Sequence, residues 1–353
     1  MIDQKEGEQD SIGIYVQIFA ALFVVLIIGS IFMYYSTSKD LKTSCGDGTA
    51  LNNCSLNAPY FCLNGTLVPQ SSICGCPEGL ISKGDLCLSD YHVDPKIVEL
   101  NYILRGEQEK IDFIVYNGMS DYIANISRTI RYSSGEVPSL DDFKSRNIND
   151  EVQREWILPL VVQIQNVAGT KEDQARIAIS VVQNIPFGRS NLTVLGFENR
   201  VNYARYPYEV LYDVEGVCSE KSELLYMILK EMGYGVVFLE YSLENHEALG
   251  VKCPVPKSMD DTGYCFIETT APAIVSDDKI IYRGGIKLSS IPKFIFPTNG
   301  SSFAEDLYEY GDAKSMIKLR NKIETTGKTN YFQHWKLESL KEKYGFDGHE
   351  YNL

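Results

Sequence analysis

Apolar residues recur at helical spacing in the central part of the chain, from about residue 151 to residue 232. Pro159 predicts a kink or a break in the first helix of this part. Thr170, with acidic residues following it, is a suitable N-cap for the second helix, and Gly233 supplies a stop for the third. The predicted helices cover residues 151–167, 170–184 and 218–232.

Short runs of β-branched and aromatic residues predict strands on both sides of these helices. Apolar and polar residues alternate in IDFIVY (111–116), and the Asn117–Gly118 pair after it predicts a turn. From residue 303 to residue 344 the chain is charged with a helical pattern, and we expect this tail to pack outside the core. The predicted strands cover residues 97–104, 109–116, 123–132, 236–241, 246–253 and 264–270, with a strand or hairpin over 279–288.

The segment Ile12–Tyr35 contains no charged residue and is long enough to cross a bilayer core as a helix. Tyrosines lie near both of its ends, where aromatic belts form. A cleaved signal peptide is the alternative, but that needs a basic leader and small residues at a cleavage site. Here the leader is acidic and the segment ends in tyrosines, so we predict an uncleaved membrane anchor.

Two kinds of signal disagree about which side of the membrane holds the bulk of the chain. Lys39 and Lys42 follow the apolar segment and only Lys5 precedes it, which weakly places the C-terminal part inside. Six closely spaced cysteines argue for an oxidising exterior, and five glycosylation sequons also follow the segment. We therefore expect a single-pass protein of the cell membrane with its C-terminal part extracellular. The candidate glycosylation sites are Asn53, Asn64, Asn125, Asn191 and Asn299.

The chain has nine cysteines, and six of them lie within about forty residues that have little apolar periodicity. Such a segment cannot fold by burial alone, so three disulfides are predicted, with no preference among the 15 possible connectivities. A zinc site is the alternative, but paired CxxC motifs are absent. The run CGCPEGLISKGDLC resembles a small EGF-like or related extracellular module. The six cysteines are Cys45, Cys54, Cys62, Cys74, Cys76 and Cys87.

Cys253 and Cys265 flank a short loop between two predicted strands, and a disulfide between them is expected. Regular pairing of these strands with the two cysteines opposite each other would place Gly250, not His246, opposite Glu268. A bulge, a loop that curls back, or unpaired cysteines would each resolve this conflict. If the bridge forms, Cys218 is the one thiol left over.

The net charge of −14 disfavours nucleic acid as a partner, because so acidic a chain repels phosphate backbones. No cofactor and no metal are expected. Four aspartates raise the question of calcium, but they lack EF-hand spacing, and solvated loops are the preferred interpretation. Glu220, Lys221 and Glu223 are interpreted as a solvated helix face. The four aspartates are Asp260, Asp261, Asp277 and Asp278.

Cys218 stands at the predicted start of a helix, where the helix dipole and unpaired N–H groups favour a thiolate and can hold an oxyanion. A thiol nucleophile also needs a base and a group that orients the base. Of four histidines, only His246 falls among the strands that follow the helix. Glu268 lies in the apolar run FIETT of the next strand, where a carboxylate needs a partner.

These three residues carry a resemblance to a known family. The order of GVCSEKSELLYMILKEMGYG, NHEALGV and YCFIETTAP resembles the transglutaminase-like superfamily over roughly residues 174–272, about a quarter of the chain. The resemblance implies an α+β, papain-like fold with Cys218 as nucleophile, His246 as base and Glu268 as orienting acid. Glutamate stands where the family commonly has aspartate, and its extra methylene requires a different geometry.

The expected protein is thus an α+β, papain/transglutaminase-like cysteine enzyme that forms a thioester with amides of proteins or peptides at the cell surface. Hydrolysis and acyl transfer both remain open, and the alternative is a non-catalytic surface binding or scaffold protein on the same fold. The expected regions are a tail over 1–11, an anchor over 12–35, a disulfide module over 41–91, a β-rich lead-in over 92–150, a transglutaminase-like domain over 151–300 and a helical tail over 301–353.

Overall fold

The structure is a computed structural model and describes residues 23, 27, 43–128, 130, 132–133, 135, 137–195, 200–282 and 285–346. The predicted anchor over 12–35 lies outside the described residues, except for Phe23 and Ile27. Among the described residues, no helix has the length and apolar character needed to cross a bilayer. The chain divides into two units, Met1–Thr43 and Ser44–Leu353, and the second contains all the elements below.

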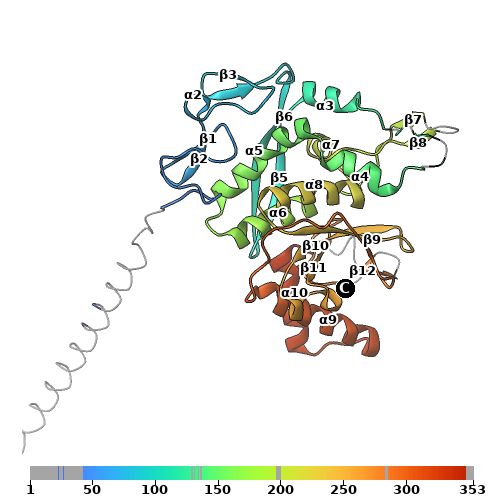
Figure 1. Cartoon of the computed structure of the whole chain (residues 1–353). Coiled ribbons are helices and arrows are strands. Elements are labelled where there is room, and N and C mark those ends of the chain that lie inside the picture. Colours follow the sequence, from blue (N-terminus) through green and yellow to red (C-terminus); the bar gives the residue numbers. More distant parts are fainter. Residues whose placement is uncertain are drawn as a thin grey trace, which may run out of the picture. The chain divides into compact units, whose positions relative to one another are not determined.

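The centre of the second unit is a four-stranded antiparallel sheet with strand order β11-β10-β9-β14. One helix, α8, packs on β9 and β10, and α5 and α6 pack against α8 (Figure 1). The sheet strands are β9 (Val236–Tyr241), β10 (His246–Lys252), β11 (Tyr264–Ile267) and β14 (Lys293–Ile295). The helices are α5 (Glu151–Val167), α6 (Lys171–Asn184), α7 (Pro207–Asp213) and α8 (Cys218–Glu231).

The two faces of the sheet bury different side chains, because alternate residues of a strand point to opposite faces. Leu249 and Val251 of β10 join the large core that contains the apolar residues of α5, α6 and α8. Ala248 of β10 and Phe266 of β11 belong to a second, smaller core cluster. The sequence predictions of these three helices and of β9 and β10 are confirmed. The strand predicted over 264–270 ends at Ile267, and β14 was not predicted.

Local chemistry accounts for the helix ends. The Thr170 side chain accepts a hydrogen bond from the Asp173 backbone N–H, as expected for the N-cap of α6. Helix α5 continues through Pro159, so the predicted break is absent. The stretch after Tyr206, for which no element is predicted, forms α7, which has a proline in its first turn.

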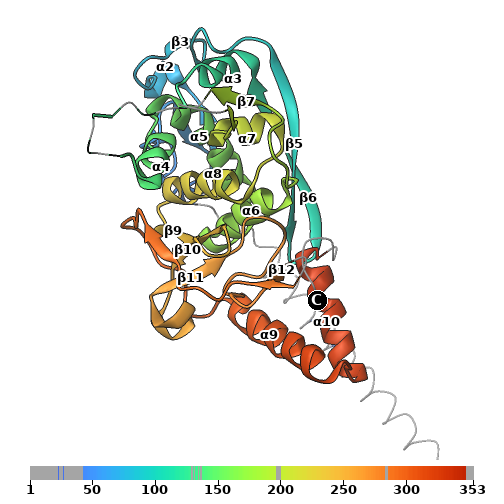
Figure 2. The same ribbon diagram turned by 90° about the vertical axis from the view of Figure 1, so that its right-hand side faces the viewer.

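A cysteine-rich module precedes the core, and disulfides hold it together as predicted. It consists of two small hairpins and a short helix next to α5 (Figures 1 and 2). Its elements are β1 (Tyr60–Leu63), β2 (Thr66–Pro69), α2 (Ser71–Cys74), β3 (Ile81–Lys83) and β4 (Leu86–Leu88). The disulfides are Cys45–Cys62, Cys54–Cys74 and Cys76–Cys87.

A long hairpin of β5 (Pro95–Leu104) and β6 (Glu107–Tyr116) follows the module and packs on α6, which confirms the two predicted strands. The predicted turn at Asn117–Gly118 and strand from Ile123 are wrong, because α3 (Asn117–Ala124) occupies both places. Ile123 is fully buried as a helical core residue, so its apolar character reflects packing rather than strand formation. The other elements before α8 are helix α4 (Leu140–Ile148) and a short hairpin of β7 (Thr193–Leu195) and β8 (Arg200–Asn202).

The C-terminal part contributes a hairpin and a helix pair, both predicted. Strands β12 (Ile281–Tyr282) and β13 (Ile286–Lys287) pair beside the sheet, and helices α9 (Tyr308–Thr326) and α10 (Tyr331–Tyr344) form a separate small core (Figure 2). Asp277 is buried and bonded to Arg320 of α9, so its interpretation as a solvated loop residue is wrong. The described part of the chain is thus mixed α and β with antiparallel sheets and four disulfides.

The loop between β10 and β11 explains how the fourth disulfide coexists with the strand register. Val251, not Cys253, lies opposite Cys265. Cys253 follows the end of β10, and its N–H donates to the Gly263 carbonyl at 3.0 Å. The chain therefore curls back to form the Cys253–Cys265 bridge, which is one of the three solutions that the sequence left open. Both half-cystines belong to the large core.

Candidate active site

Cys218 is the first residue of α8 and the only cysteine of the nine that forms no disulfide. Its side chain is half-buried. The preceding N-cap, Val217, has no side-chain hydrogen bond to the first turn. A Cβ on Gly216 would lie 3.1 Å from Lys221 and 3.2 Å from Val210, so glycine permits the close approach of the chain that enters the helix.

The charged residues of the first turns of α8 are buried, so their interpretation as a solvated face is wrong. Lys221 is fully buried, and its Nζ donates to the carbonyls of Gln183, Ile185 and Thr270 at 3.3, 2.6 and 2.7 Å. A buried ammonium requires several acceptors, and these three tie α8 both to the end of α6 and to the chain that follows β11.

A second contact anchors the segment after β11 on the same turn of α8. The buried hydroxyls of Ser222 and Thr269 lie 2.9 Å apart, and the Thr269 hydroxyl also donates to the Cys218 carbonyl at 3.3 Å. The residue just before Thr269 is Glu268. The contacts of Lys221 and Ser222 therefore hold the predicted acid beside the helix end that carries the thiol.

Glu220, also buried, holds the chain segment that leads into α8. Its carboxylate accepts from the Val217 N–H at 3.0 Å and from the Arg205 N–H at 2.8 Å. The Arg205 side chain in turn pairs with Glu215, just before the helix, and with Asp213. The turn that positions Cys218 is thus fixed by a charged network.

His246, the first residue of β10, and Glu268, the residue after β11, are hydrogen bonded. His246 Nε2 lies 2.9 Å from Glu268 Oε2. The other carboxylate oxygen of Glu268 accepts from the backbone N–H groups of Thr269 and Thr270 at 2.9 and 2.7 Å. Since an ionised carboxylate only accepts, Nε2 carries a proton, and Nδ1 is left to face the thiol.

The charges of this pair reinforce each other. Burial alone would lower the pKa of His246, but the negative charge of Glu268 and a hydrogen bond with the Cys218 thiol raise it to about 10. Burial alone would raise the pKa of Glu268, but the imidazolium and the hydrogen bonds lower it to about 2. The imidazole is therefore held positive beside the Cys218 thiol.

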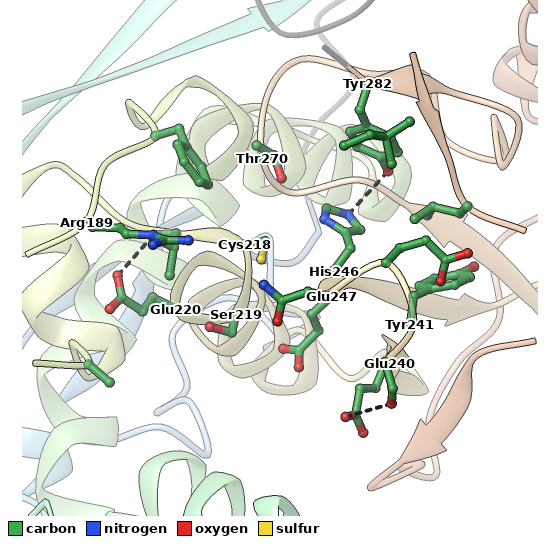
Figure 3. A pocket seen from close by; sticks show the side chains of 18 of the residues that line it. Arg189, Cys218, Ser219, Glu220, Glu240, Tyr241, His246, Glu247, Thr270 and Tyr282 are labelled. Carbon is green, nitrogen blue, oxygen red and sulfur yellow. Dashed lines mark hydrogen bonds between the residues drawn. The ribbon is translucent and has the colours of Figure 1, made fainter. Parts of the chain in front are cut away.

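Cys218 and His246 line a cleft of about 580 Å³ (Figure 3). Glu268 lies behind His246 and is fully buried. Phe187, Arg189 and other residues before α8 form one side of the cleft, and the turn between β9 and β10 forms the other. The hairpin β12–β13 contributes Tyr282 and Ile286 to the lining, and Leu288 follows directly after it. The Cys218 thiol is therefore accessible from the cleft.

The remaining predicted sites fall in separate places. All eight cysteines expected to form disulfides do so, and the asparagines of all five sequons are exposed. Among the described residues, no group of three or more His, Cys, Asp or Glu side chains is arranged to hold a metal ion. The zinc alternative is wrong, since its six cysteines are paired with one another.

The sequence interpretation missed one residue that contacts both members of the His–Glu pair. The hydroxyl of Tyr282 donates to Glu268 Oε2, and its oxygen lies 3.2 Å from His246 Nε2. Tyr282 ends the two-residue strand β12, and no periodicity in so short an element distinguishes it from the other tyrosines.

Comparison of the chain with models of protein families, with curated proteins and with solved structures gave no match.

Proposed function

We propose that this chain is a membrane-anchored, extracellular, transglutaminase-like cysteine enzyme that acts on amide bonds of proteins or peptides through a thioester on Cys218. One observation carries the proposal: a half-buried thiol, an imidazole and a buried carboxylate come from α8, β10 and the end of β11 and meet at one open cleft. The same residues carry the resemblance to the transglutaminase-like superfamily.

The chemistry begins with attack of the Cys218 thiolate on an amide carbonyl carbon, which forms a C–S bond and places a negative charge on the carbonyl oxygen. Backbone N–H groups at the N-terminus of α8 stabilise that oxyanion. The imidazolium of His246 then gives its proton to the nitrogen as the C–N bond breaks. Ammonia or an amine leaves, and an acyl thioester remains on Cys218.

The thioester is resolved by a second nucleophile that enters the same cleft. Neutral His246 takes a proton from water or from a primary amine as that nucleophile attacks the carbonyl carbon. The C–S bond breaks and the thiolate–imidazolium pair is restored. Water completes a hydrolysis, and an amine completes an acyl transfer, so the same three residues serve both outcomes.

The proposed location outside the cell rests on covalent chemistry. Four disulfides persist in an oxidising compartment, and all five sequon asparagines are exposed and accessible to a glycosylating enzyme. The uncharged segment over 12–35 supplies the anchor. A membrane-impermeant amine label applied to intact cells should modify the lysines of the 44–353 unit, and protection of those lysines would contradict this location.

The reactivity of Cys218 tests the proposal without knowledge of the substrate. We expect iodoacetamide to alkylate one thiol per chain at pH 6, about tenfold or more faster than it alkylates a free cysteine, because an imidazolium favours the thiolate. His246→Ala should reduce this rate to that of an ordinary thiol. His334→Ala, which changes an exposed histidine of α10, is the matched control and should leave the rate unchanged.

An alkylation rate no greater than that of free cysteine, and insensitive to His246→Ala, would favour the alternative of a non-catalytic surface binding or scaffold protein. A positive result would justify mass spectrometry with trial glutamine peptides. Trapping of an acyl group on Cys218, and its absence in Cys218→Ser, would establish the first half of the reaction. Release of that group by water or by an added amine would separate hydrolysis from transfer.

A further inference from the structure

Glu268 uses all of its acceptor positions, and Tyr282 supplies one of the four donors. Oε1 accepts from two backbone N–H groups of its own chain segment, and Oε2 accepts from His246 Nε2 and from the Tyr282 hydroxyl. The carboxylate is fully buried, so each missing donor would leave part of a buried charge without compensation. Tyr282 is the only one of these donors that comes from the hairpin β12–β13.

The Tyr282 hydroxyl also contacts the imidazole directly. Its oxygen lies 3.2 Å from Nε2, and the two rings have their centroids 4.8 Å apart. The hydroxyl proton goes to Glu268, so a lone pair of its oxygen faces the Nε2–H group. The Nε2 proton thus lies between two acceptors, the carboxylate and the phenol oxygen, and these two contacts fix the ring orientation that leaves Nδ1 toward Cys218. Figure 3 shows the contact between the Tyr282 hydroxyl and the imidazole.

We propose that Tyr282 is a positioning residue of this site. It fixes the Glu268 side chain, which is longer than that of an aspartate, and the plane of the His246 ring, so that the imidazole faces the Cys218 thiol. A glutamate side chain has one more rotatable bond than aspartate and needs an additional restraint to hold a carboxylate at a fixed place. The two backbone donors fix Oε1, and Tyr282 with His246 fixes Oε2. This inference rests on the proposed function for its catalytic meaning, while the geometry it describes does not depend on turnover.

The Nε2 proton of His246 is the most direct reporter of this role. The chain has only four histidines, so ¹⁵N-histidine labelling of the full-length protein gives few signals, and His246→Gln assigns the relevant one. We expect a downfield Nε2–H resonance that exchanges slowly with water in the unaltered protein. Tyr282→Phe should shift it upfield and accelerate its exchange. An unchanged resonance and exchange rate would overturn the proposal.

A double-mutant cycle tests the same role through reactivity. Tyr282→Phe should lower the rate of Cys218 alkylation or of peptide turnover by about tenfold, and by less than about twofold when Glu268→Gln is already present, because the tyrosine acts through the carboxylate. Equal losses in both backgrounds would contradict the proposal. Tyr226→Phe is the matched control: it removes a buried hydroxyl of α8 that bonds to the Phe296 carbonyl, away from the cleft, and should leave both readouts unchanged.

Two further outcomes keep this inference separate from the proposed function. If Tyr282→Phe does not fold, 3-fluorotyrosine at position 282 preserves the side-chain shape and strengthens the donor. It should then move the His246 Nε2–H resonance, and an unmoved resonance would overturn the proposal. If the unaltered protein turns over no amide yet its resonance depends on Tyr282, the proposed function fails and the positioning role stands.

Discussion

Two buried charge clusters flank the first residues of β10, and they treat their carboxylates in opposite ways. Glu268 accepts four hydrogen bonds and faces one imidazolium, and its pKa falls to about 2. Glu247 and Glu223 share the single ammonium of Lys144, and burial raises the pKa of Glu247 to about 7 despite that lysine. The number of donors and cations for each carboxylate, rather than burial itself, decides which cluster stays charged.

The two clusters also differ in what they touch. The first cluster reaches the cleft through His246, and the second reaches it through Lys144 and Glu247. Glu247 lies on the other face of β10 and pairs with Lys144 of α4, which also pairs with Glu223 of α8. Lys144 and Glu223 are almost fully buried. In the proposed reaction the first cluster carries the chemistry, whereas the second joins α4, α8 and β10 in the wall of the cleft. Charge changes in the two clusters should therefore affect different properties.

The largest expected contrast is in turnover. Glu268→Gln should lower kcat/KM for a peptide substrate by about 10³-fold, because the uncharged glutamine side chain no longer stabilises the His246 imidazolium or selects its ring orientation. Glu223→Gln, a matched change in the other cluster at a buried residue outside the cleft lining, should alter kcat/KM by less than about threefold. Steady-state kinetics on the two purified variants measures the contrast, and comparable losses in both would remove the distinction between the clusters.

A smaller but still large effect is expected on stability from the second cluster. Lys144→Met leaves two carboxylates buried without a cation and should reduce the free energy of unfolding by about 3 kcal/mol at pH 8. The loss should shrink at pH 5.5, since the carboxylates can then take up protons. Urea denaturation at the two pH values measures it.

The control for Lys144→Met is Lys293→Met, which removes an exposed lysine paired with Asp141 and should cost less than about 1 kcal/mol. A Lys144→Met loss as small as that of the control, or one that does not change with pH, would mean that the cluster contributes little as an ion pair.

The part of the first cluster that could be predicted from sequence is the part that lies on regular elements. Cys218 begins a helix whose apolar residues repeat at 3.6 spacing, and His246 begins a strand with a clear apolar run, so their order and neighbours were visible. The position of Glu268 beside His246 depends on the end of β11 at Ile267, after which the chain is irregular. Strand register alone placed it elsewhere; the need of a carboxylate in an apolar run for a partner, together with the resemblance to a family, paired the two residues.

The parts that could not be predicted depend on contacts between distant segments. Lys221 appears on a helical wheel as a solvent residue, yet its acceptors are carbonyls 36 to 49 positions away, at the ends of other elements. Lys144 is 79 and 103 positions from its two carboxylates. A buried cation of this kind leaves no periodic signal, because its partners are set by tertiary packing. The hydrophobic pattern predicts the core, but it misses the polar contacts that position the side chains of the site.

The smallest expected effect is on how the free energy of unfolding depends on pH, which differs between the two clusters. The pKa of His246 is raised from 6.5 to about 10, so its stabilisation is fully present below about pH 6.5 and is lost as the pH rises through about 10. His246→Gln should therefore lower the free energy of unfolding by about 2 kcal/mol at pH 6 and by progressively less toward pH 10. Thermal or urea unfolding of the unaltered and His246→Gln proteins across this range, with reductant excluded to keep the disulfides intact, gives the difference.

Glu247→Gln should change the dependence of the free energy of unfolding on pH only between about pH 4.5 and 7, where the raised pKa of Glu247 makes stability fall as the pH rises. A gap between the His246→Gln and unaltered proteins that stays constant up to pH 10 would show that His246 contributes by packing, and that its charge does not distinguish the two clusters.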